Sequence, residues 1–393
     1  MIAPTPFFSH RGSHIRILEE ARALERLGHK ITIVTYHNGD DIYKYITTNI
    51  DVRRIRRWLF WYKKTEAGPD WQKVLLNIFL IVKSFNMIRL QKPDIIHGHL
   101  HEGVLIGRLM QIVFFWKDIP LISDFHGSLV GEMRSHGYLK VLPIGTVFRK
   151  IEKWISGMGD VAVVSGEENV SVIAEARKDK KAFYLQDGVN IEQYNGDYDK
   201  MKLREKYNVP KDKFVIVYTG ALIQNKGINH ILDAISNIAK KIPKTHFVIG
   251  GFPADWVYNY VKERNLNEFV NIISPLNYFS LSEVNKTGDI AIDPKDASVG
   301  QASGKLLQYM ATRIGIICAD RPTNRKYLSQ NSAIFLKEVN AETITDAVQK
   351  FFDNPKLLDD CASNAYEDVK KFDWQRIGKK LDEIYKELIG EDK

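Results

Sequence analysis

Residues 289–320, DIAIDPKDASVGQASGKLLQYMATRIGIICAD, decide the fold class of this chain. An apolar run at 290–292 leads into a glycine-rich loop, a helical segment opens with SGK at 303–305, and a second apolar run occupies 314–319. Two continuous apolar strands joined by a helix are typical of a parallel sheet that is covered on both faces. The stretch therefore predicts an α/β domain. Its loop is a candidate phosphate cradle because free amides open the helix, although the spacing is not that of a Walker loop.

The same alternation of apolar runs and helical segments recurs along the chain. Further apolar or β-branched runs occur at 31–36, 95–97, 121–124 and 161–164, and then at 215–219, 246–250 and 270–273. The polar, turn-rich segment between these two sets, residues 187–213, is the expected linker. We therefore predict two doubly wound Rossmann-like domains that face a central cleft, residues 1–187 and 188–372, with ligands beyond the carboxyl ends of the strands.

Composition excludes several classes of protein. The chain has 393 residues, of which 44% are hydrophobic and 26% charged, which suits two ordinary globular domains. Cys318 and Cys361 are the only cysteines, which excludes a disulfide scaffold and a four-cysteine zinc site and favours the reducing cytoplasm. The first ten residues lack a signal-peptide pattern, and the longest apolar run, 74–87, is interrupted by Lys83. We expect that run to form a buried or interfacial helix.

The first expected strand is followed by the loop PTPFFSHRGS (4–13) and by a helix at about 14–27. Because helix amides and the helix dipole favour anions, the loop around Gly12 predicts an anion site; an ordinary strand-to-helix turn is the alternative. Met1 falls inside the strand itself, so either the strand is short or the natural start lies upstream.

Histidines gather at two further strand ends of the first domain. In HGHLH (97–101) the alternating histidines, His99 among them, would share one face of a strand, either as metal ligands or as polar lining of the cleft. We favour the lining, because no carboxylate or cysteine cluster accompanies them beyond Glu102. His126 follows the run at 121–124 and is a candidate cleft residue; a core histidine satisfied by a backbone carbonyl is the alternative.

Cationic side chains follow two strands of the second domain. The strand that ends at Gly220 leads to Lys226 at a helix entrance, where its charge and the helix dipole suit a diphosphate oxygen. A solvated loop lysine is the alternative. The helix that opens at 303–305 carries Gln308, and its amino end is the stronger phosphate-cradle candidate.

Residues 53–64, RRIRRWLFWYKK, combine six basic with four aromatic side chains. The net charge of the chain is +8, and most of the excess lies in residues 1–195, with 27 basic against 21 acidic residues. Such a mixture suits the headgroup region of an anionic membrane. We expect four of these side chains to form a membrane or acceptor face: Arg56, Arg57, Trp58 and Trp61. Nucleic-acid binding and a loop that packs its aromatic side chains on the domain are the alternatives.

Nearly the whole chain resembles the GT-B glycosyltransferases of glycosyltransferase family 4, which are retaining enzymes that use nucleotide sugars. The resemblance rests on the order and spacing of these motifs: the Gly12 loop, LERLGHKITIVT (24–35), KPDIIHGHLHEG (92–103), His126, VAVVSGEENV (161–170), LQDGVNIEQY (185–194), YTGALIQNKGI (218–228), SGKLLQYMA (303–311) and FDWQRIGKKLDEIYKEL (372–388). It implies that the last helix, 373–393, packs back on the first domain.

The resemblance also implies roles for the candidate residues. His126 is the catalytic residue that positions the sugar or the acceptor hydroxyl. The donor diphosphate and nucleotide would be held by Gly12, Gly220, Lys226, Ser303, Gly304, Lys305 and Gln308. Further candidate substrate contacts are His99, Asp293 and Gly300.

The chain departs from the family pattern at three positions. The basic residue that normally follows the strand is Ala221 here, and the Glu-x7-Glu pair maps to Gly300 and Gln308, although Asp293 and Asp296 lie nearby in sequence. A missing arginine removes a charge-assisted phosphate contact that is worth about 1.5–3 kcal/mol. Other cationic groups or helix amides would have to replace this contact.

We predict a retaining glycosyltransferase of hexosyltransferase type. It would move a sugar from a UDP- or GDP-type nucleotide sugar to a hydroxyl on a lipid-linked or membrane-proximal glycan. The family implies a front-face reaction in which the leaving phosphate helps to deprotonate the acceptor, so no enzymic nucleophile, metal or further cofactor is expected. A GT-B nucleotide-sugar epimerase and a catalytically silent subunit that partners another transferase are the alternatives. We expect a cytoplasmic protein that is peripheral on the inner face of the membrane and has no nucleic-acid partner.

Overall fold

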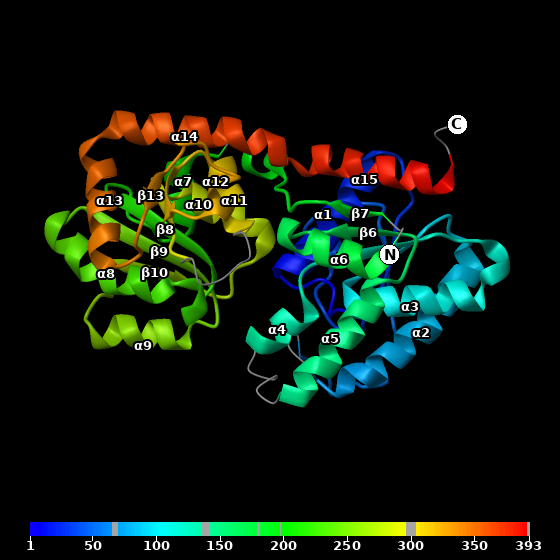
Figure 1. The fold of residues 1–393 in the computed structure, drawn as a ribbon. Helices are drawn as coiled ribbons and strands as arrows, with labels where there is room; N and C mark the ends of the chain where they lie inside the picture. The colour runs from blue at the N-terminus through cyan, green and yellow to red at the C-terminus, as the bar shows by residue number, and fades with distance from the viewer. Residues whose placement is uncertain (65–69, 136–141, 179–180, 197, 296–303, 391–393) are drawn as a thin grey trace. The chain divides into compact units, whose positions relative to one another are not determined.

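The computed structural model describes residues 1–64, 70–135, 142–178, 181–196, 198–295 and 304–390. The chain divides into two compact units. Unit 1 comprises Met1–Asp187 together with Trp374–Lys393, and unit 2 comprises Gly188–Asp373. Each unit is built on its own parallel sheet (Figure 1).

Unit 1 contains a seven-stranded sheet with the strand order β3-β2-β1-β4-β5-β6-β7, in which all neighbours are parallel. Its strands are β1 (Ile2–Ala3), β2 (Thr32–Thr35), β3 (Asp51–Arg54), β4 (Ile96–His99), β5 (Leu121–Phe125), β6 (Val161–Val164) and β7 (Ala182–Tyr184). Its helices are α1 (Gly12–Arg26), α2 (Gln72–Gln91), α3 (Leu100–Val113), α4 (Leu129–Ser135), α5 (Leu142–Ser156), α6 (Val170–Arg177) and α15 (Trp374–Ile389), with short 3-10 helices at Ile42–Lys44, Phe115–Lys117 and Glu167–Asn169.

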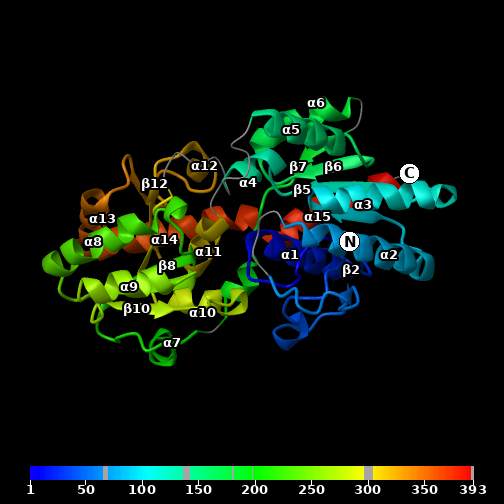
Figure 2. The same ribbon diagram turned by 90° about the horizontal axis from the view of Figure 1, so that it is seen from below.

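Helices cover both faces of this sheet. On one face, Leu80 of α2 and Met110 of α3 join strand residues such as Leu121 in one apolar core. On the other face, α1 and α15 pack against each other (Figures 1 and 2). Gly378 of α15 permits this close approach, because an added Cβ would lie 2.5 Å from the Cβ of Ala23 in α1. The last helix is therefore part of the first unit.

Unit 2 contains a six-stranded parallel sheet with the order β10-β9-β8-β11-β12-β13. Its strands are β8 (Phe214–Ala221), β9 (Thr245–Phe252), β10 (Val270–Ile273), β11 (Ile290–Asp293), β12 (Gly315–Ala319) and β13 (Ile334–Leu336). Its helices are α7 (Lys200–Lys206), α8 (Ile228–Lys241), α9 (Asp255–Glu263), α10 (Leu281–Lys286), α11 (Gly304–Thr312), α12 (Pro322–Arg325), α13 (Ala341–Asp353) and α14 (Pro355–Val369), with 3-10 helices at Ile191–Tyr194, Gln224–Lys226, Tyr278–Ser280 and Lys370–Phe372.

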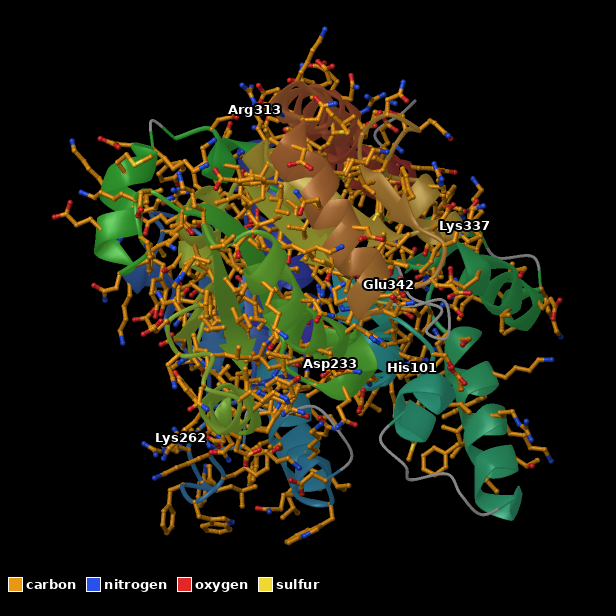
Figure 3. All side chains as sticks on the ribbon, turned by 90° about the vertical axis from the view of Figure 1, so that its left-hand side faces the viewer. His101, Asp233, Lys262, Arg313, Lys337 and Glu342 are labelled. Carbon is orange, nitrogen blue, oxygen red and sulfur yellow. The ribbon has the colours of Figure 1, made fainter. Side chains whose placement is uncertain are left out.

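The helices of unit 2 also form two apolar layers. Helices α8 and α13 lie side by side, and Figure 3 labels one residue on each, Asp233 and Glu342. Their buried residues, for example Ile235 and Val348, form one core with the strands. Helices α11 and α14 contribute to a second core around Ile316. The sheet is thus covered on both faces, as continuous apolar strands require.

Two parallel sheets confirm the predicted α/β fold class. The central cleft stays a prediction. The segment 187–213 differs from the expected linker, because it contains the 3-10 helix Ile191–Tyr194 and α7. Arg204 of α7 is buried and pairs with Asp289 at 2.8 Å, which fastens the segment to unit 2. The first strand is short and contains only Ile2 and Ala3.

Candidate active site

The loop after β8 brings Lys226 close to the end of β11. Lys226 ends a 3-10 helix and Gly227 precedes α8 with a φ of 77°. An added Cβ at Gly227 would lie 2.4 Å from the carbonyl oxygen of Pro294, which directly follows β11. Only glycine fits there, because the backbone is left-handed and the two loops approach closely. Two strand-end loops that are separate in sequence therefore meet at this edge of the sheet.

Lys305, the second residue of α11, reaches the same edge. Its Nζ lies 3.1 Å from Oδ1 of Asp293, the last residue of β11, and 4.2 Å from the centre of the Tyr218 ring. Burial disfavours the charge, but Tyr218 and Asp293 raise the pKa of Lys305, so the lysine stays protonated. An added Cβ at Gly220 would lie 3.7 Å from this Nζ. The predicted residues Gly220, Asp293 and Lys305 are thus neighbours.

Lys295 and Arg321 belong to this group although the sequence analysis missed them. Lys295 is buried, and burial together with the charges of Lys226 and Arg321 lowers its pKa to about 8. Burial also lowers the pKa of Lys226, and the charge of Lys305 adds to the effect. Four cationic side chains therefore act on one another beside the carboxylate of Asp293. We call Lys226, Lys295, Lys305 and Arg321 the cationic cluster. Four cationic side chains at one place suit a diphosphate.

The remaining donor candidates lie at or beside α11. Gly304 is its first residue, so its amide belongs to the free amino end of the helix. Gln308 follows one turn later, and its backbone carbonyl accepts a hydrogen bond from Thr312 at 2.7 Å. Ser303 and Gly300 lie outside the described residues, as does Asp296.

His126 lies just beyond β5 in unit 1 and contacts a carboxylate rather than a backbone carbonyl. Its Nε2 donates to Oδ2 of Asp124 at 3.0 Å, and the side chain is 4% exposed. Within the described residues its Nδ1 has no hydrogen-bond partner. In the neutral ring with Nε2 donating to Asp124, Nδ1 carries the lone pair and can accept a hydrogen bond from a hydroxyl.

His99 lies behind His126 and is fully buried. β4 and β5 pair in a register that places His99 opposite Asp124, and the His99 Nδ1 lies 3.0 Å from the Asp124 Oδ2. Burial and the nearby His97 lower the pKa of His99 well below its usual value, so its ring is neutral. His99, which the sequence predicted as a substrate contact, is therefore buried in unit 1, where its ring contacts Asp124.

Arg16 neutralises the carboxylates beneath these histidines. Its guanidinium lies 2.8 Å from Glu20, 3.4 Å from Asp124 and 2.8 Å from Asp187. Burial alone would raise the pKa of Asp124, but Arg16 and the hydrogen bond from His126 hold it well below its usual value. Burial raises the pKa of Glu20 well above its usual value, against the charge of Arg16. Asp124 is thus the ionised partner of His126. The sequence signals for this network are the Asp inside LISDF and the Arg inside the apolar stripe of α1.

The same network contains a group of side chains that could serve as metal ligands, the possibility that the histidine spacing raised. In the described part of the chain, Glu20, His97, His99 and Asp124 offer ligand atoms within 4.8 Å of one another. Arg16 contacts both carboxylates and already supplies the positive charge that a metal would supply. We therefore interpret the group as an ion-pair and hydrogen-bond network.

The expectation that three alternating histidines share one strand face is wrong for His101. β4 ends at His99, so His101 is the second residue of α3 and its Nε2 lies 3.8 Å from Glu152. His97 and His99 do share a face and stack at 4.2 Å. The strand ends early because the chain turns directly into α3.

Gly12 begins α1, and the side chain of the preceding residue, Arg11, does not cap the helix. The loop before it is fastened by His14, whose Nδ1 accepts from the backbone amide of Ser9 at 3.0 Å. Burial lowers the pKa of His14 to about 3, so this ring is neutral and its Nδ1 can accept. An added Cβ at Gly12 would meet nothing within 4 Å. The amino end of α1 is thus an open helix terminus of the kind that favours anions.

The basic and aromatic segment 53–64 alternates between buried and exposed side chains. Leu59 and Tyr62 are buried, whereas Trp58, Phe60 and Trp61 are each more than half exposed. Arg56 and Arg57 are also exposed. Apart from Tyr62, the aromatic side chains of this segment are therefore mostly exposed, although Trp58 stacks on Phe79 and the Trp61 indole donates to Gln72, both on α2. Beside them, a cavity of about 510 Å³ opens at the loops after β1 and β2, lined by Phe8, Ser9, His10, His37, Asn38, Gly39, Asp40, Arg57, Tyr62 and Lys63.

Helix α2 continues this surface. Leu76 and Leu80 are buried, whereas Val74, Ile78 and Val82 are more than half exposed. Of the helices in the described ranges, α2 alone has the length and apolar composition that crossing a membrane requires, and 28% of its apolar window is buried in unit 1.

Two doubly wound parallel-sheet units, one with a cationic cluster at its strand ends, are the architecture of the GT-B glycosyltransferases. Sequence comparison agrees with this class: residues 10–193 match the family described as Glycosyltransferase Family 4, and residues 199–368 match Glycosyl transferases group 1. The chain belongs to the GT-B glycosyltransferases of family 4, and it is a glycosyltransferase.

Relatives span most of the chain at low identity. The putative glycosyltransferase EpsD of Bacillus subtilis is 22% identical over 76% of this chain and 78% of its own length. The alpha-monoglucosyldiacylglycerol synthase of Acholeplasma laidlawii is 20% identical over 94% of this chain and 92% of its own length. The crystal structure of HepE from Anabaena in complex with UDP and glucose superimposes with a TM-score of 0.72 at 13% identity, covering 98% of this chain and 97% of that one. The last likeness shows the fold.

Proposed function

We propose that the chain transfers a sugar from a nucleotide diphosphate donor to a hydroxyl acceptor with retention of the anomeric configuration. The observation that carries the proposal is the cationic cluster at the carboxyl ends of β8 and β11. Two phosphates bring negative charge that the cationic cluster can compensate, and Lys305 of this cluster also contacts Asp293. The neighbouring amino end of α11 adds free amides.

The proposed step needs no nucleophile from the protein. The bond between the anomeric carbon and the diphosphate oxygen breaks, and the acceptor oxygen bonds to that carbon on the same face. The acceptor proton passes to the departing diphosphate oxygen. Negative charge grows on the leaving group during this step, so preorganised cations lower the barrier.

Lys295 is proposed to replace the arginine that this chain lacks at Ala221. It directly follows the strand-end proline, and its pKa of about 8 means that most molecules carry the charge at neutral pH. Binding a diphosphate would raise this pKa, because an opposite charge favours the protonated form. Lys295, after β11, would thus replace the cation that is missing at the end of the neighbouring strand β8.

His126 is proposed as the residue that orients the transferred sugar or the acceptor hydroxyl. Its Nδ1 is the acceptor that Asp124 leaves available, and the open amino end of α1 lies in the same unit. A fixed ring orientation reduces the entropy lost on binding in the reactive geometry.

The acceptor is proposed to be lipid-linked or membrane-proximal. The exposed aromatic and basic side chains at 56–61 and the adjoining cavity support this assignment, since Trp and Arg suit the interface of an anionic membrane. A relative that spans 94% of the chain is named as a synthase of a glucosylated diacylglycerol. Peripheral attachment at the inner face of the membrane is part of this proposal.

A donor panel tests the transfer. UDP-, GDP- and ADP-sugars are assayed by nucleotide release, with and without a detergent-solubilised lipid extract. Release that requires the extract is the expected result. Release and a rearranged sugar without any acceptor would identify an epimerase instead. No release, together with no nucleotide binding by calorimetry, would identify a silent subunit.

The stereochemistry and the metal requirement are separate measurements. NMR of the glycosylated product should show the anomeric configuration of the donor; the opposite configuration would overturn retention. Activity should survive treatment with EDTA, because the cationic cluster supplies the charge. Loss with EDTA and recovery with a divalent metal would overturn this part of the proposal.

Attachment through the aromatic segment is tested with vesicles. Trp58→Ser/Trp61→Ser should bind phosphatidylglycerol vesicles more weakly than wild type in co-sedimentation. Both side chains are more than half exposed, so this variant should fold normally. Binding equal to that of the wild type would exclude the segment as the membrane contact.

A further inference from the structure

Unit 1 carries a second cavity, which is basic and lies away from the loops at the carboxyl ends of the strands. We call it the basic hollow. It has a volume of about 600 Å³ and is formed where α3, α5 and α6 meet. Its lining residues are Arg108, Ile112, Lys150, Lys153, Trp154, Gly157, Met158 and Ala176. Three of them are cationic and none is acidic, so a bound anion would meet a net positive wall.

The three cations lie on two adjacent helices at spacings that keep them together. Lys150, Lys153 and Trp154 follow one another at i, i+3 and i+4 on α5, so they share one face of that helix. Arg108 and Ile112 are one turn apart on α3, which packs against α5. The hollow is thus built by secondary structure and not by a loop.

Charges that would compete for these cations are engaged elsewhere. Glu152 lies between the two lysines in sequence, but its carboxylate accepts from the backbone amide of Leu129 at 2.7 Å. Arg108 donates to the neutral side chain of Gln111 at 3.0 Å. Within the described residues, Lys150 and Lys153 have no ion-pair partner. The positive charge of the hollow is therefore available to a ligand.

The rim of the hollow is apolar and exposed. Trp154 is 60% exposed and Ile112 is 58% exposed. Three positions beyond Ile112, Phe115 is 76% exposed, and Trp116 follows it. Large apolar side chains beside a set of cations match the boundary between the headgroups and the acyl chains of a bilayer. A ligand that is wholly soluble would gain nothing from this rim.

We infer that this hollow binds the phosphate headgroup of an anionic phospholipid, with Arg108, Lys150 and Lys153 on the phosphate and Trp154 and Ile112 on the upper acyl chains. The inference rests on the proposed membrane-proximal function and adds a second contact to the segment 53–64. Phosphate is expected as the anion because several cations can share its oxygens.

The test is co-sedimentation with phosphatidylcholine vesicles that contain or lack phosphatidylglycerol. Each Lys or Arg near an anionic surface contributes about 1 kcal/mol, so Lys150→Gln/Lys153→Gln should bind the anionic vesicles roughly 10–30-fold more weakly. Trp154→Ala should weaken binding while leaving its salt dependence unchanged, since this change removes no charge. Lys150, Lys153 and Trp154 are all exposed, so circular dichroism should show that both variants fold like the wild type.

Lys379→Gln/Lys380→Gln is the matched control. Both lysines are exposed on α15, on the other face of the unit 1 sheet, and the change in net charge is the same. The inference predicts that this control keeps most of the wild-type affinity. Equal losses in the two double variants would show that only net charge matters and would overturn the specific site. Equal binding to vesicles with and without phosphatidylglycerol would overturn headgroup recognition.

Failure of the inference and failure of the proposed function are distinguishable. Wild-type protein is assayed in parallel for acceptor-dependent nucleotide release in detergent, where no bilayer is present. Release without binding to anionic vesicles would overturn the headgroup site and leave the transfer reaction standing. Vesicle binding that depends on Lys150 and Lys153, without release, would support the site and count against the transfer.

Discussion

The Nε2 of His126 lies 3.0 Å from the Oδ2 of Asp124, two positions earlier at the end of β5. Asp124 is fully buried and Arg16 holds it in the ionised form. The carboxylate therefore fixes both the orientation of the imidazole and the nitrogen that carries its proton. In the proposed reaction Asp124 would act through His126, as a positioning residue.

Asp124→Asn should lower kcat about 10–100-fold while the affinity for the donor nucleotide, measured by calorimetry, changes little. The reason is that the proposed donor site lies in unit 2, whereas the contacts of Asp124 with His126, His99 and Arg16 all lie in unit 1. Ser123→Ala is the control on the same strand, because Ser123 donates to the Met158 carbonyl and does not contact His126. Parallel losses in kcat and donor affinity would contradict the positioning role.

Lys226→Ala should weaken binding of the donor nucleotide roughly 10–100-fold, the size expected for one charge-assisted hydrogen bond. Isothermal titration with UDP and GDP measures it. Lys262→Ala is the matched control, because Lys262 is an exposed lysine on α9 of the same unit (Figure 3). An unchanged affinity in Lys226→Ala would remove this lysine from the donor site.

Donor affinity should fall as the pH rises through about 8, because Lys295 then loses its proton. The affinity is measured by titration between neutral and alkaline pH. Lys295→Arg should flatten this dependence, since an arginine stays charged over the whole range. A wild-type profile that is flat through this range would show that Lys295 does not contact the diphosphate.

Gly227→Ala should lower the free energy of unfolding by at least about 2 kcal/mol, because the left-handed backbone alone costs roughly 1–2 kcal/mol for alanine. Its Cβ would also lie 2.4 Å from the Pro294 carbonyl oxygen. Denaturant unfolding measures the loss. Gly304→Ala should be tolerated, because no atom of the described residues lies within 4 Å of a Cβ there. Equal stabilities of the two variants would rule out the close approach of these loops.

Stability should fall when the pH is lowered from 7 to 5. Burial lowers the pKa of His14 to about 3 and that of His101 to about 4. Between pH 7 and 5 the unfolded chain therefore binds protons at these two histidines, whereas the folded chain does not. Stability from these groups is complete above about pH 6.5 and is lost towards their folded pKa values. One such histidine costs roughly 2 kcal/mol by pH 5. His101→Phe should reduce this slope in denaturant unfolding measured at both pH values; an unchanged slope would mean that the pKa of His101 is the same in the folded and the unfolded chain.

Long apolar runs could be read directly from the sequence, and short or mixed ones could not. The runs at 161–164 and 215–219 fall in β6 and β8, because continuous burial selects continuous apolar residues. Strands β3, β7 and β13 escaped the analysis: each lies at an edge of its sheet or has half-buried residues, so its pattern is weak. β3 in particular reads DVRR and runs into the basic segment 53–64, so its charged residues give no apolar strand pattern.

The sequence by itself determined the α/β class, the order of strands and helices, and the strand-end positions of Gly220, Lys226 and His126. Those features depend on local periodicity and on the rule that parallel strands present their carboxyl ends at one edge. The tertiary structure alone decided that Lys295 and Arg321 join the cationic cluster, that Asp124 holds His126, and that three helices enclose a basic hollow on unit 1. These groupings depend on which strands become neighbours and how closely helices pack, and such distances are not encoded in the spacing of residues along the chain.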